Sequence, residues 1–83
     1  MAASKQDVES WVNEGKRTKG CTHVLIVCDT YDWEDYSVLV LEGQDVHKIT
    51  AENNGHNMTK LMEVYSMKMD IKKQLGEHRA FNY

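Results

Sequence analysis

The sequence predicts an α+β fold in which one helix and an antiparallel two-stranded hairpin are followed by two or three helices packed on the sheet. Three observations predict it: an amphipathic stretch at residues 5–18, two short apolar runs at residues 22–29 and 36–42, and a methionine-rich stretch with helical spacing at residues 57–75. The 83 residues suffice for a single domain, residues 1–83. A domain of this size buries a smaller fraction of its surface than larger domains do and has a thin stability margin, so we expect a homo-oligomer.

Residues 5–18 form the first predicted helix. Ser4 is a good N-cap, Asp7 three residues later completes a capping-box-like pair, and Gly20 is suited to end the helix. Apolar side chains recur at the i, i+3 and i+4 spacing of one helix face, at Val8, Trp11 and Val12. This face is expected to be buried.

The runs at residues 22–29 and 36–42 are typical of β-strands, because they are β-rich apolar stretches too short for helices. The simplest topology is an antiparallel pair joined by the polar and aromatic residues 29–36. Apolar side chains on both faces indicate that the sheet is covered on both sides. A lone hairpin is barely stable, so helices must cover it or a second chain must extend it through its open edges.

Beyond the strands, the sequence predicts a short helix and then a longer helical region. Asp45 can cap the short helix, whose apolar face holds Val46 and Ile49. Asn57 can cap the next region, residues 57–75.

Residues 57–75 form either one long helix or two, the second beginning near Ile71. The apolar stripe has helical spacing and comprises Met58, Leu61, Met62, Tyr65 and Met69. Further apolar residues widen the stripe, so this region is expected to bury more than one side. Phe81 and Tyr83 are expected to pack back on the body of the domain.

Composition and charge disfavour several classes of protein. The formal net charge of −3 argues against direct nucleic-acid binding, which normally uses a basic face. There is no apolar run long enough to span a membrane and no apolar signal segment at the N-terminus, so no membrane partner is expected. Cys21 and Cys28 would lie roughly 20 Å apart on an extended strand, too far for a disulfide, which favours a cytoplasmic location.

Residues 29–36, DTYDWEDY, interleave four carboxylates with three aromatic rings. The glycine and distal glutamate of a calcium loop are missing, so no metal site is predicted. Catalysis by paired carboxylates needs burial, which nothing in the sequence indicates. Two interpretations stay open: a solvated loop, or a recognition surface in which the rings anchor a partner and the acids select a basic one. The candidate partner-binding residues are Tyr31, Asp32, Trp33, Glu34, Asp35 and Tyr36.

Lys16, Arg17 and Lys19 are possible phosphate-binding residues at the end of the first helix. The alternative is a solvated helix end whose cations complement the helix dipole. The sequence contains no phosphate-cradling loop, nucleophile elbow or zinc-protease motif. It therefore predicts a non-enzymatic protein with no catalytic residue and no cofactor.

Two longer stretches, VCDTYDWEDYSVLV and MEVYSMKMDIKKQLGEHRAFNY, carry a resemblance. From Thr22 onward the chain resembles a group of short uncharacterised proteins encoded by phages and prophages. That resemblance implies an accessory phage protein in the cytoplasm of an infected or lysogenic bacterium. It brings no catalytic residue with it.

Small phage proteins of this kind often blunt host defence, which is an analogy at the level of the class. The function predicted is that of a small binding protein that counters host defence by binding a host protein with a basic surface. A first alternative is sequestration of a small nucleotide signal in a pocket between subunits. A second is a structural or metal-binding module with no host target.

Overall fold

The computed structural model describes residues 5–55, 58–77 and 80–83. The helices and strands follow the order α1 (Lys5–Arg17), β1 (Cys21–Asp29), β2 (Glu34–Leu41), α2 (Val46–Glu52), β3 (Thr59–Ser66) and α3 (Ile71–Leu75). The predicted α+β class is confirmed. The sheet, however, has three strands where the sequence predicted two.

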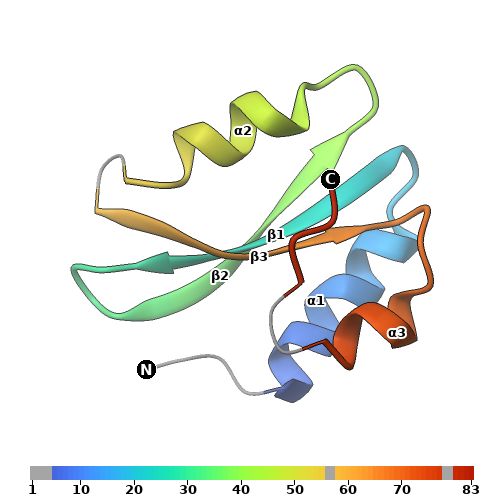
Figure 1. Cartoon of the computed structure of the whole chain (residues 1–83), viewed down its shortest axis with the longest axis horizontal. Coiled ribbons are helices and arrows are strands. Elements are labelled where there is room, and N and C mark those ends of the chain that lie inside the picture. Colours follow the sequence, from blue (N-terminus) through green and yellow to red (C-terminus); the bar gives the residue numbers. More distant parts are fainter. Residues whose placement is uncertain (1–4, 56–57, 78–79) are drawn as a thin grey trace.

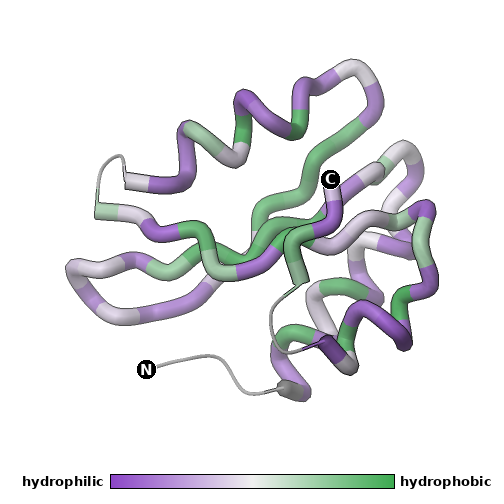
Figure 2. Tube along the Cα trace, viewed as in Figure 1, coloured by the Kyte–Doolittle hydropathy of each residue, from purple (hydrophilic) through white to green (hydrophobic). Residues whose placement is uncertain are grey.

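Within the described ranges the chain forms three layers. The antiparallel sheet has the order β2-β1-β3, so β1 is its central strand. α1 and α3 lie on one face and α2 lies on the other (Figure 1). Side chains alternate along β1, so Val24 and Ile26 pack toward α1 and α3 while Leu25 and Val27 pack toward α2. Figure 2 shows the apolar residues concentrated in the strands between the helices.

The first helix is close to its predicted bounds and buries the predicted face. Val12 is fully buried, and Val8 and Trp11 pack around it against the sheet. Gly15 continues this face where helix and strand come closest: a Cβ at this position would lie 2.2 Å from Cγ2 of Val24. A side chain there would push α1 off the sheet.

The helix predicted over residues 57–75 is wrong in its first half, because Thr59–Ser66 form β3. This strand pairs with β1, and its register shifts between Ile26 and Val27. At the shift Met62 is the extra residue of a β-bulge.

The bulge explains why a strand has the spacing of a helix. Leu61 and Val64, three residues apart, both belong to the cluster on the α2 side. Met62 and Tyr65, also three apart, belong to the cluster on the α1 side. A regular strand would place residues two apart on the same face, so the inserted residue produces a local period of three that resembles a helix stripe.

The connection between the first two strands is shorter than the eight residues that the sequence predicted. The β1–β2 ladder continues to the pair Asp29 and Glu34, so the loop comprises residues 30–33. Glu34, Asp35 and Tyr36 therefore belong to β2. The antiparallel pairing itself is confirmed.

The predicted short helix and separate last helix are both confirmed. Asp45 caps α2 by accepting hydrogen bonds from two backbone N–H groups, of which the closer is that of His47 at 2.9 Å. Asp70 caps α3 in the same way. The predicted caps Ser4 and Asn57 lie outside the described residues.

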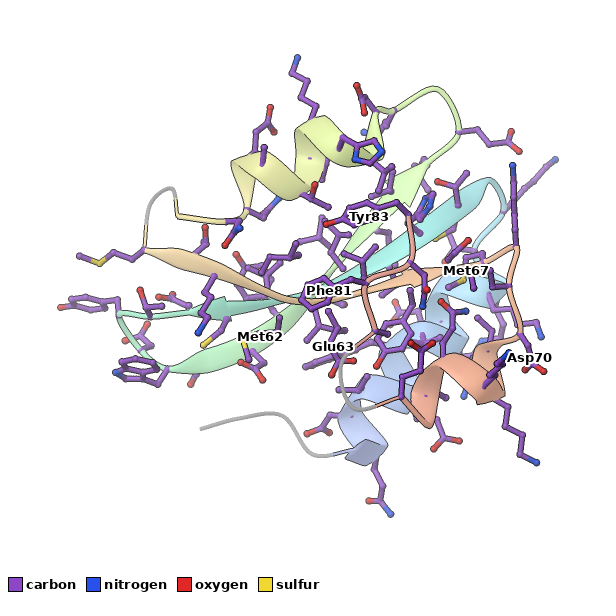
Figure 3. The ribbon with its side chains drawn as sticks, in the orientation of Figure 1. Met62, Glu63, Met67, Asp70, Phe81 and Tyr83 are labelled. Atoms are coloured by element: carbon purple, nitrogen blue, oxygen red, sulfur yellow. The ribbon has the colours of Figure 1, made fainter. Side chains whose placement is uncertain are left out.

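The C-terminal residues lie along the outer edge of β3. The N–H of Val64 donates to the carbonyl of Ala80 at 2.7 Å, and the N–H of Asn82 donates to the carbonyl of Val64 at 3.0 Å. Tyr83 then stacks on His47 of α2, with ring centroids 4.8 Å apart. The expectation that the chain end packs back on the body is thus confirmed, and Figure 3 labels Phe81 and Tyr83 on this segment.

A buried glutamine fixes α3 to the end of β3. Gln74 is 1% exposed, and its side-chain amide pairs with the backbone of Ser66 through two hydrogen bonds of 2.8 Å, one donated and one accepted. Its Oε1 also accepts a hydrogen bond from Nδ2 of Asn82 at 3.1 Å. The side chain of Gln74 therefore joins α3 to the end of β3 and to the C-terminal segment.

Candidate functional site: an aromatic and acidic hairpin tip

The hairpin tip, defined here as residues 30–36, is held by one carboxylate. Oδ1 of Asp29 accepts hydrogen bonds from the N–H of Tyr31 at 2.8 Å and of Asp32 at 3.4 Å. This arrangement is an Asx-turn, in which a short acidic side chain organises the residues that follow it. Asp29 therefore has a structural role in the tip.

A second contact ties the tip to the start of β3. The carbonyl of Met58 accepts hydrogen bonds from the N–H of Thr30 at 2.7 Å and from its hydroxyl at 2.9 Å. Met58 and Trp33 both adopt left-handed backbone conformations, with φ of 59° and 57°. Such angles are uncommon for residues other than glycine.

Large apolar side chains gather at this end of the sheet. Tyr31 is 73% exposed, Trp33 is 63% exposed and Met58 is 59% exposed. Asp32 and Glu34 are also exposed and lie among them. Exposed apolar side chains gathered among polar residues are typical of interaction surfaces.

The strand part of the tip divides its side chains between the two faces of the sheet. Tyr36 pairs with Val27, whose side chain points toward α2, so the half-exposed ring of Tyr36 lies on that face. Asp35 pairs with Cys28 on the opposite face and is half-buried. Only part of the predicted set of six therefore forms one continuous exposed surface.

Asp35 acts on a buried thiol. Burial raises the pKa of Cys28, and the hydrogen bond and negative charge of Asp35 raise it further. A thiol with a raised pKa stays protonated at neutral pH and is a poor nucleophile. Cys28 and Cys21 are both free cysteines.

The three predicted phosphate-binding residues do not form one site. Lys16 lines a groove of about 310 Å³ between α1 and α3, and Lys72 lines the same groove. Arg17 instead lines a shallow polar depression on the outer side of α1. Lys19 is exposed in the turn before β1. This basic end of α1 and the hairpin tip lie at opposite ends of the long axis of the molecule (Figure 1).

One partly buried polar pair was not predicted from the sequence. The hydroxyl of Tyr65 donates a hydrogen bond to Glu63, both on the α1 side of the sheet, where Figure 3 labels Glu63 and Met62. Burial, this hydrogen bond and the charge of Glu63 raise the pKa of Tyr65 above its ordinary value, and Glu77 adds to the effect. Met58 was also missed as a neighbour of the tip, because its sequence region was assigned to a helix.

Among the described residues, no three His, Cys, Asp or Glu side chains gather to hold a metal ion. None of the described helices has the length and apolar character needed to cross a membrane. Comparison of the chain with family models, curated proteins and solved structures finds no match.

Proposed function

We propose that this protein is a small binding protein that engages a basic surface of a partner protein through its hairpin tip. The observation that supports this most is the exposure of Tyr31, Trp33 and Met58 together at one end of the sheet, among exposed carboxylates. Rings anchor interfaces because they bury much area with few rotatable bonds. Surrounding acids steer a cationic partner and set its register.

The tip is organised before any partner arrives. Asp29 holds the turn through two backbone N–H groups, and the carbonyl of Met58 holds Thr30 through two more hydrogen bonds. A preorganised surface loses less conformational entropy on binding than a mobile loop does. Hydrogen-bonded loops of this kind can therefore present Trp33 in one orientation.

The backbone at Trp33 adds support. Its φ of 57° lies in the left-handed region, where a residue with a side chain is less stable than glycine by roughly 1–2 kcal/mol. Any side chain at this position therefore carries a conformational cost, and the sequence has a tryptophan there whose ring is 63% exposed. Strain of this kind is often found at functional sites.

The resemblance to phage and prophage proteins supports a bacterial partner. In that setting we propose that the target is a host defence protein, since many such proteins act on nucleic acids and carry basic surfaces. The tip would cover that surface. This places the protein among inhibitors that act by occlusion rather than by chemistry.

The test uses three immobilised baits: the unmodified protein, Trp33→Ala and Tyr83→Ala. Tyr83 is the matched control because it is an exposed ring, 50% exposed, that stacks on His47 away from the tip. We expect a bacterial protein that the unmodified and Tyr83→Ala baits retain and the Trp33→Ala bait loses. Its retention should fall as NaCl rises from about 0.1 M to about 0.5 M. Equal retention by Trp33→Ala, or retention insensitive to salt, contradicts the proposal.

A second candidate function, binding of a small nucleotide signal, is supported by the groove that Lys16 and Lys72 line together. Its volume of about 310 Å³ is at the lower end of ligand pockets. The side chains that line it include no aromatic ring, so base stacking would require a second copy of the chain. A thermal-shift screen with linear and cyclic nucleotides tests this, because a tight ligand raises the melting temperature. An unchanged melting temperature contradicts it.

A further inference from the structure

The two edges of the sheet differ. The outer edge of β3 is occupied by residues 80–82, which pair with Val64. On the other side, within the described ranges, the sheet ends at β2. We propose that the outer edge of β2 accepts an extended segment of the partner as an added strand, with basic residues at both ends of that segment and β-branched residues between them. This inference rests on the proposed function and specifies how the partner binds.

Two hydrogen bonds at the ends of β1 show how its backbone groups alternate between β3 and β2. The N–H of Thr30 donates to Met58, and the carbonyl of Thr22 accepts from the N–H of Met67, so even-numbered residues of β1 turn their backbone groups toward β3. The odd-numbered residues therefore turn theirs toward β2, because backbone groups alternate in direction along a strand.

The same alternation fixes which groups of β2 face outward. Val38 lies opposite Leu25, an odd-numbered residue of β1, so the backbone groups of Val38 point toward β1. Its neighbours Ser37 and Leu39 point theirs away from the sheet. Leu41, two residues after Leu39, has its backbone groups on the same side, and its N–H donates to Oε1 of Gln44 at 2.8 Å rather than to β1. Ser37 and Leu39 are thus the donors and acceptors available to an added strand.

Charge along this edge specifies the added segment. Exposed carboxylates lie at both ends, Asp32 and Glu34 at the tip and Glu42 just past the strand. The middle of the strand, with Val38 and Leu39 half-buried, is apolar. An extended segment that is basic at both ends and β-branched in the middle matches this order, because opposite charges attract across strands and β-branched residues suit a pleated surface.

A second copy of the chain fits this edge less well. Two β2 strands that pair antiparallel about a two-fold axis at Val38 bring Glu34 of each copy opposite Glu42 of the other, since both lie four residues from the axis. Like charges directly opposite each other are destabilising. An added basic segment would instead neutralise both ends and continue past Trp33, so a single partner can contact the edge and the tip.

The test uses a synthetic nonapeptide, Lys-Lys-Thr-Val-Thr-Val-Thr-Lys-Lys, with blocked termini. Binding to the isotopically labelled protein is followed by NMR titration and by amide hydrogen exchange. We expect slowed exchange at Ser37 and Leu39. Two further peptides carry N-methyl groups on alternate amides, one on each alternate set. At least one of them should bind about tenfold more weakly or worse, because several backbone hydrogen bonds are lost.

Equal binding by all three peptides, unchanged exchange at Ser37 and Leu39, or no binding of the unmodified peptide overturns strand addition. A dimer that protects these amides without peptide also overturns it, because a second copy then holds the edge. The variant Trp33→Ala separates the two proposals. If Trp33→Ala binds the peptide normally while losing the bacterial partner, both the tip proposal and the strand-addition proposal stand. If Trp33→Ala keeps that partner, the proposed role of the tip fails, and the strand-addition proposal is decided by the peptide experiments alone.

Discussion

The molecule contains two regions in which tyrosines lie beside carboxylates, and their environments are opposite. Tyr65 is 2% exposed, and its hydroxyl donates to Glu63 inside the fold. Tyr31 is 73% exposed, with the exposed carboxylate of Asp32 beside it in the chain. The comparison shows that residue type does not decide whether such a pair stabilises the fold or faces solvent. Position relative to the helices decides it.

The cover of the sheet explains the difference. α1 and α3 both lie over the end of the sheet where β1 begins, and the hairpin tip extends beyond them (Figure 1). Tyr65 lies near the end of β3, in the cluster formed with Val12 of α1. The tip is at the other end of the strands. Four predictions separate the interior region from the tip, in order of decreasing effect on stability.

The largest effect is expected from Gln74→Met, at the junction of β3 and α3. A methionine has similar length but leaves the N–H and C=O of Ser66 without their side-chain partner. Each buried polar group left unpaired costs about 1–3 kcal/mol, so the free energy of unfolding should fall by about 3 kcal/mol. Urea denaturation measures it. Lys73→Ala, an exposed change in the same helix, is the control and should alter stability by less than about 0.5 kcal/mol.

A smaller and pH-dependent effect is expected from Tyr65→Phe. Near pH 7 loss of the hydrogen bond to Glu63 should cost about 1 kcal/mol. The pKa of Tyr65 is raised in the fold above its ordinary value of 10.0, so above that pH the unfolded chain loses this proton while the folded protein retains it. The contribution of Tyr65 is therefore complete below pH 10 and declines above it.

Urea denaturation of both proteins between pH 8 and pH 11 measures this decline. The gap in stability between the unmodified protein and Tyr65→Phe should narrow as the pH rises above 10. Titrations common to both proteins cancel in the difference. A gap that stays constant over this range would show that the folded and unfolded states release the tyrosine proton together, and a gap that widens would show that the folded state releases it first.

At the tip, Asp29→Ala should lower stability by about 0.5–1 kcal/mol, because it removes the acceptor for two backbone N–H groups. Amide hydrogen exchange should accelerate most at Tyr31 and Asp32, and at the core residue Val24 by no more than the loss of global stability accounts for. Asp29→Asn retains an acceptor oxygen and is the matched control. Equal acceleration in both variants would mean that the carboxylate charge, rather than the turn, holds these residues.

The smallest effect on stability is expected from Trp33→Ala. The ring is 63% exposed and lies outside both core clusters, so the free energy of unfolding should change by less than about 0.5 kcal/mol. Trp33→Gly should raise stability slightly, because glycine adopts φ of 57° without steric strain. A loss of more than about 2 kcal/mol in Trp33→Ala would mean that this ring belongs to the interior region.

The fold was readable from the sequence wherever periodicity was regular. α1 follows the i, i+3 and i+4 pattern, and β1 is one uninterrupted apolar run. β3 was not readable, because the bulge at Met62 gives it the spacing of a helix and no local signal marks that insertion. The strand that β3 pairs with, β1, lies far away in the chain, so only tertiary pairing identifies β3 as a strand.

The residues of the candidate site could be predicted from the sequence, but their arrangement in space could be predicted only in part. The stretch DTYDWEDY identified the tip, but its alternation places Tyr36 and Asp35 on opposite faces once the ladder extends to Glu34. Met58 joins the tip through a carbonyl hydrogen bond to Thr30, a backbone contact between segments distant in sequence. Such contacts depend on the path of the whole chain and leave no pattern in the side chains.

The covered outer edge of β3 limits how this sheet can grow. Because Val64 already exchanges hydrogen bonds with Ala80 and Asn82, β2 is the one sheet edge open to further strands in the part of the chain that the structure describes. Folded chains with two open sheet edges can stack edge to edge into fibres, whereas a chain with a single open edge has no second edge to offer to the next copy. Edge-to-edge association of folded chains should therefore stop at a pair, and the protein should resist strand-mediated polymerisation even at high concentration.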